Sequence, residues 1–294
     1  MPGTEDPGKF LRGGEFYSPV RSRLSRGGVL LSELLQPCSR SVPRHEHELA
    51  YVTLVLRGDY LEGDRHLDEM RPLTAVFNPA GVTHNTAIGP AGASFFTVEF
   101  QPEARRDLNV QLPPSTAFDP GAGWMLWPVL GLYTAFKDGG SDPLVFDAHV
   151  LELLGAISGL NSREKPEISQ PKWFARVKER LHEEFRSGLR MTDLARDAGV
   201  HPVHLARVFR RIERRTPGEY QHQLQVRAAC ELLRDPDWSL AAIAAECGFA
   251  DQSHFTRIFR RITRATPARF RQNLVAPHGP LYQDHEPPSR VYCR

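Results

Sequence analysis

The sequence predicts an α+β protein whose N-terminal part is rich in β-strands and whose C-terminal part is all helical. Three observations lead to this prediction. Short runs of β-branched and aromatic residues, separated by turn residues, occupy positions 27–101 of the 294. From position 124 onwards the apolar residues recur at helical spacing instead. An arginine-rich phrase also occurs twice in the C-terminal part, as ARVFRRIERRTP from Ala206 and as TRIFRRITRATP from Thr256.

The β-rich part contains four clear strand candidates, bounded by Gly, Pro, Asn or Asp. They read GVLLSEL, AYVTLVL, LTAVFNP and SFFTVEF. Short strands at this spacing predict a small β-barrel or sandwich over residues 27–101. We expect residues 1–26, which precede these strands, to form an N-terminal arm.

The segment 102–162 contains two helix candidates, WMLWPVLGLYTAF and PLVFDAHVLELLGAISGL. In the second, one apolar stripe follows helical spacing, and it consists of Phe146, Val150, Leu153, Leu154 and Ile157. Such a stripe forms either part of the core or the seam of a dimer. We predict that residues 102–162 are a dimerisation segment of a homodimer, with the helix Phe146–Leu160 at its seam.

Two polar segments predict the remaining domain boundaries. Residues 163–171 lie within NSREKPEISQPK, whose two prolines and polar side chains are typical of a linker. Residues 172–274 then form the helical domain. The final segment 275–294 is rich in proline and polar residues, which predicts a disordered tail.

The charge is distributed unevenly although the net charge of the chain is only +2. Residues 1–171 carry 15 basic and 21 acidic side chains, whereas residues 172–274 carry 20 basic and 12 acidic ones. This asymmetry predicts a polyanionic partner for the helical domain alone. The apolar runs are too short to span a bilayer, so we expect no membrane partner. The four cysteines form no CxxC pair, which argues against a zinc finger and fits a cytoplasmic protein.

The duplicated phrase predicts two amphipathic helices with arginines on the solvent side. Each copy follows a short helix and a glycine, Gly199 in the first case and Gly248 in the second. Thr192 and Ser239 stand where the short helices need N-caps. Helix, glycine-containing turn and second helix are the parts of a helix-turn-helix, whose second helix enters the DNA major groove. The predicted inward faces consist of Leu205, Val208, Phe209 and Ile212 in the first copy and of Phe255, Ile258, Phe259 and Ile262 in the second.

Residues 172–274 resemble the DNA-binding domain of the AraC/XylS family of transcriptional regulators. The matching phrases are LARDAGVHPVHLARVFRR, TPGEYQHQLQVRAACELL and IAAECGFADQSHFTRIFRRITRATPARFRQ. The resemblance implies base contacts from Val203, Ala206 and Arg207 in the first helix and from Gln252, Ser253, His254, Thr256 and Arg257 in the second. It implies phosphate contacts from Arg210, Arg211, Arg260 and Arg261. Because the side chains of Val203 and Ala206 cannot donate hydrogen bonds, we expect them to contact thymine methyl groups.

Three histidines mark a second candidate site, in PRHEHELAYV and FNPAGVTHNT. His45 and His47 are two residues apart, so both point to one face of a strand, and His84 follows in a PxGxxH phrase. This arrangement resembles the cupin fold, although Tyr51 and Val52 stand where a cupin has a glutamate. The histidines predict either a pocket for a small-molecule effector or a site for a divalent metal, with no cofactor required. Glu46 lies on the opposite strand face and is a poor ligand candidate.

These features together predict a sequence-specific transcription regulator of the AraC/XylS type with a cupin-like N-terminal sensor barrel. Its expected partners are double-stranded promoter DNA, a small-molecule effector, a second copy of the chain and RNA polymerase. One alternative is a metal-dependent cupin enzyme, of the dioxygenase or isomerase type, with a helical appendage. Another alternative is a protein that coats DNA without sequence preference.

Overall fold

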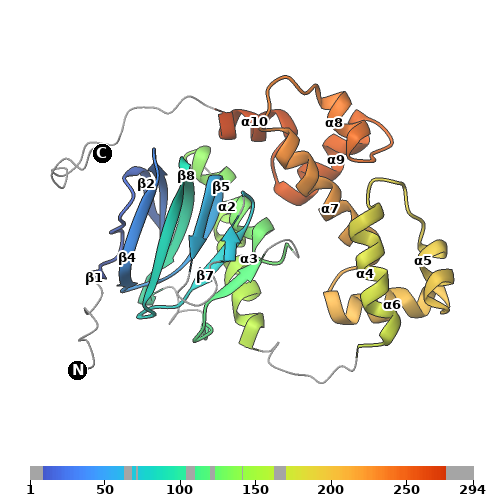
Figure 1. The fold of residues 1–294 in the computed structure, drawn as a ribbon, viewed down its shortest axis with the longest axis horizontal. Helices are drawn as coiled ribbons and strands as arrows, with labels where there is room; N and C mark the ends of the chain where they lie inside the picture. Colours follow the sequence, from blue (N-terminus) through green and yellow to red (C-terminus); the bar gives the residue numbers. More distant parts are fainter. Residues whose placement is uncertain are drawn as a thin grey trace. The chain divides into compact units, whose positions relative to one another are not determined.

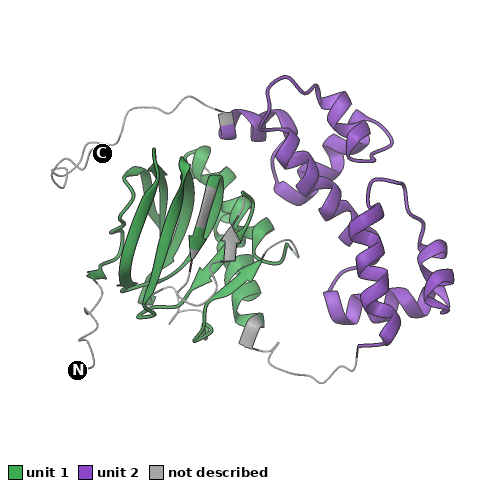
Figure 2. Ribbon diagram, in the orientation of Figure 1, with its two compact units in different colours: residues 1–162, 277–294 green, residues 163–276 purple. Residues whose placement is uncertain are grey.

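The computed structural model describes residues 9–62, 68–70, 72–103, 110–119, 123–140, 142–161 and 170–275. The chain divides into two compact units, one containing Met1–Ser162 and the other containing Arg163–Ala276 (Figure 2). Most of the predicted linker lies outside the described residues, as do the first eight residues of the predicted arm and residues 276–294 of the predicted tail. Among the described residues, no helix combines the length and the apolar character needed to cross a membrane.

The N-terminal unit is built on one mixed sheet (Figure 1). Its strands are β1 (Lys9–Leu11), β2 (Val20–Arg26), β3 (Val29–Gln36), β4 (Arg40–His47), β5 (Ala50–Glu62), β6 (Asp68–Met70), β7 (Ala75–Asn78), β8 (His84–Phe100) and β9 (Ala117–Asp119). The hydrogen-bonded path runs β1-β4-β8-β5-β7-β9, and β3 pairs with both β2 and β8. The α+β class is therefore confirmed. Within the described residues the sheet is open, with β1 and β9 at the ends of this path, rather than a closed barrel.

The long strand β8 organises the sheet because it pairs with three other strands. Its first half lies between β4 and β5, and its second half lies between β3 and β5. Successive residues of β8 point to opposite faces of the sheet. Phe95 and Thr97 line a cavity on one face. Phe96 lies between them and contacts Tyr133 and Phe136 of a helix on the other face.

Two helices complete the N-terminal unit, α2 (Leu126–Lys137) and α3 (Pro143–Asn161). The α2 helix packs against β5 and against α3. The predicted apolar stripe of α3 is fully or almost fully buried within this unit, and it consists of Phe146, Val150, Leu153, Leu154 and Ile157. The stripe is thus core, which is one of the two alternatives, and these five side chains are not available as the seam of a dimer. The reason is that α2, itself apolar on nearly every side, already covers them.

The C-terminal unit is all helical in its described residues, as predicted. Its helices are α4 (Lys172–Glu184), α5 (Met191–Ala198), α6 (Pro202–Glu213), α7 (Pro217–Leu232), α8 (Leu240–Glu246), α9 (Gln252–Thr263) and α10 (Pro267–Val275). The α7 helix contacts α4 and α6 and also contacts α8 and α9. It therefore joins two helical bundles, and its start is fixed by a reciprocal capping box between Thr216 and Glu219.

Each bundle has its own apolar core. In the first bundle, Phe174 of α4, Phe209 of α6 and Tyr220 of α7 pack ring against ring. In the second bundle, Phe255, Phe259 and Phe270 form a similar chain of aromatic contacts. Cys230 and Cys247 are buried free thiols within this unit. Burial raises the pKa of the Cys247 thiol to about 11, so this side chain is an uncharged packing residue at neutral pH.

Candidate nucleic-acid interface and ligand pocket

The first arginine-bearing helix, α6, is positioned by a tight turn after α5. Gly199 ends α5 with a φ of +66°, a left-handed conformation that glycine adopts without steric cost. His201 then caps α6, because its Nδ1 accepts a hydrogen bond from the backbone N–H of Val203 at 3.3 Å. The predicted N-cap Thr192 lies inside α5 instead, one residue after the helix begins, and Arg190 occupies the cap position.

The second arginine-bearing helix, α9, follows the same plan with stronger caps. Ser239 caps α8 by accepting a hydrogen bond from the backbone N–H of Ala242 at 3.1 Å, as predicted. Gly248 follows with a φ of +78°. Asp251 caps α9 by accepting a hydrogen bond from the backbone N–H of His254 at 2.7 Å. Both turns therefore have the glycine conformation that the helix-turn-helix prediction requires.

The predicted inward faces of both helices are the faces that pack into the two cores. Leu205 and Phe209 of α6 are buried, and Val208 and Ile212 are partly buried beside them. In α9, Phe255, Ile258 and Phe259 are buried and Ile262 is partly buried. This packing fixes the rotation of each helix about its axis and decides which residues face solvent.

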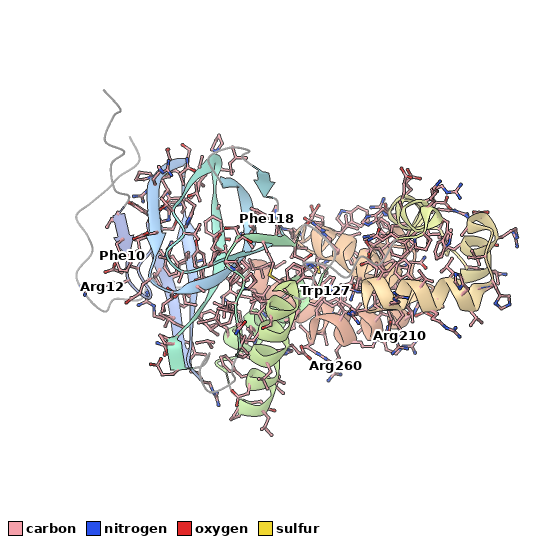
Figure 3. All side chains as sticks on the ribbon, turned by 90° about the horizontal axis from the view of Figure 1, so that it is seen from below. Phe10, Arg12, Phe118, Trp127, Arg210 and Arg260 are labelled. Carbon is pink, nitrogen blue, oxygen red and sulfur yellow. The ribbon has the colours of Figure 1, made fainter. Side chains whose placement is uncertain are left out.

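The arginines occupy the opposite, exposed faces. Those on α6 are Arg207, Arg210 and Arg211, and those on α9 are Arg257, Arg260 and Arg261. Arg210 and Arg260 extend outward from their helices (Figure 3). Within the described part of the chain, Arg207, Arg210, Arg257 and Arg260 form no ion pair. Their charge is therefore available to an anionic partner.

The other predicted base-contact residues also lie on α6 and α9, with different degrees of exposure. Val203, Gln252 and Ser253 are exposed, and 58% of the Val203 surface is accessible, which is unusual for a large apolar side chain. Ala206, His254 and Thr256 are half-buried. His254 is also engaged by its own turn, because its Nδ1 accepts a hydrogen bond from the backbone N–H of Ala250 at 3.4 Å.

The two arginine faces converge near the start of α7. The pKa of the Glu219 carboxyl is lowered, first by the backbone N–H of Thr216 and also by the charges of Arg210 and Arg261. One of these arginines comes from α6 and the other comes from α9. Because both charges act on the same carboxylate, Arg210 of α6 and Arg261 of α9 both lie near Glu219 of α7.

The three histidines predicted as a site do come together in the N-terminal unit. His45 of β4 and His84 of β8 are directly paired across the two antiparallel strands. His47 lies two residues further along β4. One ring nitrogen from each of the three lies within 4.8 Å of the others, and all three side chains are buried. The strand register therefore brings together residues that are 39 positions apart in the chain.

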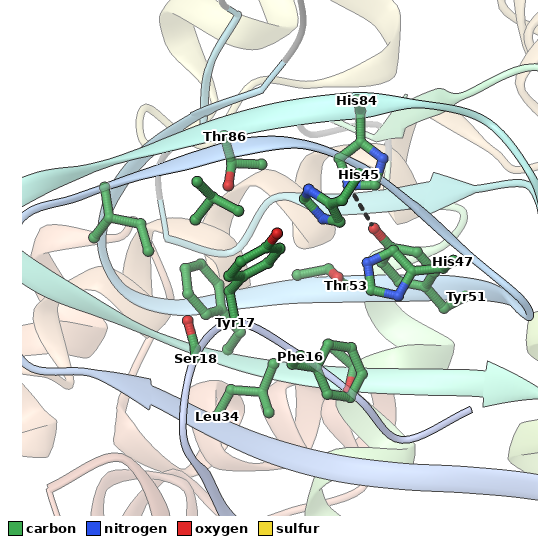
Figure 4. A pocket seen from close by; sticks show the side chains of 14 residues that line it. Phe16, Tyr17, Ser18, Leu34, His45, His47, Tyr51, Thr53, His84 and Thr86 are labelled. Atoms are coloured by element: carbon green, nitrogen blue, oxygen red, sulfur yellow. Dashed lines mark hydrogen bonds between the residues drawn. The ribbon is translucent and has the colours of Figure 1, made fainter. Parts of the chain in front are cut away.

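The histidines line a cavity of about 520 Å³, counting the part that is open to solvent (Figure 4). Its wall includes apolar side chains such as Leu34, Val42 and Ile88. Hydroxyl groups are contributed by Ser18, Thr53, Thr86 and Thr97. Aromatic rings are contributed by Phe16, Tyr17, Tyr51 and Phe95. The cavity thus combines apolar walls with a few polar groups, as small-molecule sites usually do.

Hydrogen bonds fix the orientation of two of the imidazoles. His45 Nδ1 lies 2.8 Å from the carbonyl oxygen of Pro43, and His84 Nδ1 lies 3.3 Å from that of Val82. Because a carbonyl oxygen only accepts, each Nδ1 carries the proton and donates it. Each Nε2 is then left with a lone pair. His84 Nε2 accepts a hydrogen bond from the Tyr51 hydroxyl at 3.1 Å.

All three imidazoles are neutral at pH 7. Burial lowers the pKa of His45 to about 4 and that of His47 to about 3, and the neighbouring His84 lowers both further. Burial also lowers the pKa of His84. A group of neutral imidazoles can accept hydrogen bonds or coordinate a metal ion, whereas a group of imidazolium ions can do neither.

Sequence reasoning missed the part of the cavity wall that comes from the N-terminal segment. Phe16, Tyr17 and Ser18 precede β2 and line the cavity together with the histidines. The backbone N–H of Gly14 donates to both carboxyl oxygens of Glu99 at 2.9 and 3.0 Å, which holds this segment against β8. No local pattern predicts this contact, because its partners are 85 residues apart.

Comparison with known proteins identifies the helical unit. Residues 194–273, from within α5 to within α10, match a family model described as a helix-turn-helix domain. The C-terminal unit contains a helix-turn-helix domain. The Msm operon regulatory protein of Streptococcus mutans serotype c (strain ATCC 700610 / UA159) is 28% identical over 92 residues, which are 31% of this chain and 33% of that protein. The chain thus covers about a third of the length of this relative.

Two further proteins are similar to this chain. The uncharacterized HTH-type transcriptional regulator YfiF of Bacillus subtilis (strain 168) is 25% identical over 230 residues, which are 70% of this chain and 71% of that protein. A crystal structure from Chromobacterium violaceum, described as a transcriptional regulator of the AraC-type DNA-binding domain-containing proteins, is 27% identical. It covers 37% of this chain and 96% of that chain, with a TM-score of 0.34.

These matches confirm the predicted helix-turn-helix domain. The matched region contains both copies of the arginine-rich phrase and the helix α7 that joins them. The relatives are named as regulators, and the alternative of a metal-dependent cupin enzyme finds no support among them.

Proposed function

We propose that the protein regulates transcription by binding a specific promoter sequence through α6 and α9. The observation that carries this proposal is the pair of exposed arginine faces on two helix-turn-helix units joined by α7. Two such units joined by one helix could enter two successive major grooves on one side of a duplex, about 34 Å apart. The protein would then act in the cytoplasm, together with RNA polymerase at its promoter.

The two helices are proposed to read DNA by different chemistry. In α9, Gln252, Ser253 and Arg257 can hydrogen-bond to base edges, and Thr256 and His254 lie beside them. In α6, the exposed Val203 and the neighbouring Ala206 suit the methyl groups of thymine, which leaves Arg207 as the main hydrogen-bonding residue. Arg210, Arg211, Arg260 and Arg261 lie further along the helices and are proposed to bind phosphates.

A salt titration tests this function against the alternative of a protein that coats DNA without sequence preference. A fragment that the protein protects in a footprint of the DNA flanking its own gene would be compared with a scrambled fragment of equal length. Specific binding should remain roughly 1,000-fold or more tighter at physiological salt. Equal affinities at every salt concentration would support the coating protein instead.

The cavity of the N-terminal unit is proposed to bind the effector. Among the described residues that line it there is no Asp, Glu, Lys or Arg. The wall therefore suits either an uncharged molecule with hydrogen-bonding groups or a divalent metal ion held by the neutral histidines. In this view the unit containing Met1–Ser162 is the sensor, and the AraC-type domain is the output.

The effector proposal can be tested in cells before the effector is identified. His45→Leu removes a ring nitrogen from the cavity and leaves α6 and α9 unchanged. We expect the variant to protect the same promoter sequence in a footprint while a reporter loses its response to growth conditions. A response that survives in His45→Leu and equally in His84→Leu would contradict the assignment of this cavity.

A second copy of the chain is proposed to bind the outer face of α3. Leu144 and Leu151 are 80% and 51% exposed, and they lie on one helix face with Ala148 between them. Exposed aliphatic side chains in a row often mark an interface, and two copies of one helix can pair with twofold symmetry. Sedimentation equilibrium should give a dimer for the wild type and a monomer for Leu151→Glu. An unchanged mass would place the dimer contact elsewhere.

A further inference from the structure

Tyr51 lies beside the three-histidine cluster, in the place where a fourth metal ligand would be needed. It lies four residues after His47, where the cupin-like sequence pattern has a glutamate. It is the second residue of β5 and is 5% exposed. Its hydroxyl lies 3.1 Å from His84 Nε2, and its ring centroid lies 4.6 Å from that of His47 (Figure 4). The Tyr51 side chain therefore lies beside two of the three imidazoles, those of His47 and His84.

The ring nitrogens of the cluster can coordinate a metal ion, which accepts their lone pairs. The carbonyl oxygens of Pro43 and Val82 bind the Nδ1 protons of His45 and His84, which leaves both Nε2 lone pairs turned away from those carbonyls. A backbone carbonyl in this position is a common outer partner of metal-binding histidines. His47 Nδ1 is buried and has no hydrogen-bond partner. An unpaired buried nitrogen is energetically unfavourable, and a bound ligand would remove this cost.

Few side chains of the cavity wall can supply a negatively charged ligand to a metal ion at the three histidines. Three neutral imidazoles contribute no charge, and no carboxylate lies among the described residues of the cavity wall. Glu46 is not in the cavity wall, and Glu48 accepts a hydrogen bond from the backbone N–H of Gly13 outside it. The phenol groups of Tyr51 and Tyr17 are the side chains in the described wall that can become anionic ligands.

We propose that Tyr51 is the fourth ligand of a divalent transition-metal site, with its phenolate oxygen beside nitrogens of His45, His47 and His84. On binding, the Tyr51 proton passes to solvent and the oxygen binds the ion. The hydrogen bond from Tyr51 to His84 Nε2 is lost, and the freed lone pair of that nitrogen binds the same ion. Late first-row ions such as Cu²⁺ and Zn²⁺ suit imidazole ligands. The inference deepens the proposed sensor function and rests on it only for the role of the ion, since binding itself is measured without DNA.

Titration of the full-length protein with Cu²⁺ tests the proposal directly. A phenolate bound to Cu²⁺ gives a visible charge-transfer absorption that imidazole ligands alone do not give. We expect this band in the wild type at one equivalent of Cu²⁺. Tyr51→Phe keeps the ring but removes the oxygen, so the band should vanish and the affinities for Cu²⁺ and Zn²⁺ should fall by roughly 10- to 100-fold or more.

Tyr17→Phe is the matched control, because Tyr17 also lines the cavity and its ring lies 5.1 Å from that of His45. This variant should retain both the band and the affinity. A wild-type protein that binds no ion, or binds it without a phenolate band, would overturn the proposal. So would a band that disappears in Tyr17→Phe and persists in Tyr51→Phe. Far-UV circular dichroism of each variant shows that the fold is retained.

A second variant keeps the test decisive if Tyr51→Phe does not fold. Tyr51→Glu introduces a carboxylate, so it should bind Zn²⁺ and Cu²⁺ but show no phenolate charge-transfer band. This band in the variant would assign the phenolate to another residue and overturn the proposal. DNA binding is measured separately on the same samples. Loss of metal binding with specific DNA binding intact refutes only this inference, whereas metal binding without specific DNA binding refutes the regulatory function.

Discussion

Arg257 lies on the first half of α9, one turn after its Asp251 cap, and its guanidinium is exposed and free of ion pairs within the described residues. This position suits a base edge in the major groove, where an arginine can bind guanine O6 and N7 together. We predict that Arg257→Ala weakens binding to the cognate site by about 1–3 kcal/mol and relaxes the preference at one base pair. Quantitative footprinting on single-base variants of the site measures both the loss of affinity and the change in base preference. Unchanged discrimination would show that Arg257 does not read a base.

Arg210 lies near the C-terminal end of α6, two turns beyond Val203, and its charge acts on Glu219 at the start of α7. This position suits a phosphate. We predict that Arg210→Ala weakens binding to cognate and scrambled DNA alike and reduces the slope of affinity against salt by about one. Fluorescence anisotropy over a range of salt concentrations measures both effects. A loss confined to the cognate sequence would reverse the assignments of Arg210 and Arg257.

Glu99 is a buried carboxyl that holds the N-terminal segment in place. Burial raises its pKa to about 7, although the N–H of Gly14 and the charge of Arg23 act in the opposite direction. In the unfolded chain its pKa is the ordinary 4.5. The folded state therefore binds the proton more tightly. The resulting stabilisation is complete below about pH 4.5 and is lost as the pH rises through about 7.

The Glu99→Gln variant isolates this effect, because an amide does not titrate. Relative to wild type, we predict that its free energy of unfolding increases between pH 5 and pH 8 by up to about 3 kcal/mol. Urea unfolding of both proteins at each pH gives the difference, in which all other titrating groups cancel. A difference that stays constant with pH would show that the carboxyl titrates normally in the fold.

At the scale of elements, the turn between α8 and α9 depends on Gly248. Its φ is +78°, and a Cβ at this position would lie 2.2 Å from the carbonyl oxygen of Arg186. Gly248→Ala should therefore lower the free energy of unfolding by more than the roughly 1–2 kcal/mol that a left-handed alanine costs by itself. The matched control is Gly218→Ala in α7, where a Cβ meets no atom within 4 Å and helix propensity should stabilise the protein by up to about 1 kcal/mol. Thermal unfolding that changes equally in both variants would contradict this account.

The elements with a strong apolar period were predictable from the sequence. The α3 helix and the strands β5 and β8 include all the residues predicted for them, whereas α2, β3 and β7 begin one or two residues later than predicted. The β4 strand was recognisable only from the alternation of His45 and His47, because it contains Pro43 and three charged residues within Arg40–His47. Pro43 is accommodated where the register between β4 and β8 shifts. Local propensity carries no information about such a bulge.

The candidate sites were predictable to different extents for a physical reason. The arginine faces follow from helical periodicity, so their residues were identified one by one from local sequence. The histidine cluster could be predicted from the strand alternation of His45 and His47 and from the resemblance to the cupin fold. The role of α3 could not be decided, because a buried stripe and a dimer seam have the same period, and only the packing of α2 distinguishes them. The contribution of Phe16 and Tyr17 to the cavity depends on contacts between distant segments.

At the scale of the whole molecule, the central claim is that one chain reads two adjacent segments of one duplex with two different helices. The arginines of α6 and α9 stand at the same positions in both copies, and the core positions are apolar in both. The positions proposed to contact bases differ, with Val203 and Ala206 in α6 against Ser253 and Thr256 in α9. Common positions would then determine affinity for the backbone, and differing positions would determine which bases are preferred.

Selection of bound DNA from a random pool, followed by sequencing, measures this claim most directly. We predict an enriched site with two unlike conserved blocks whose centres lie about 10–10.5 base pairs apart, one of them rich in thymine. Enrichment of a single block, or of no sequence at all, would contradict the account.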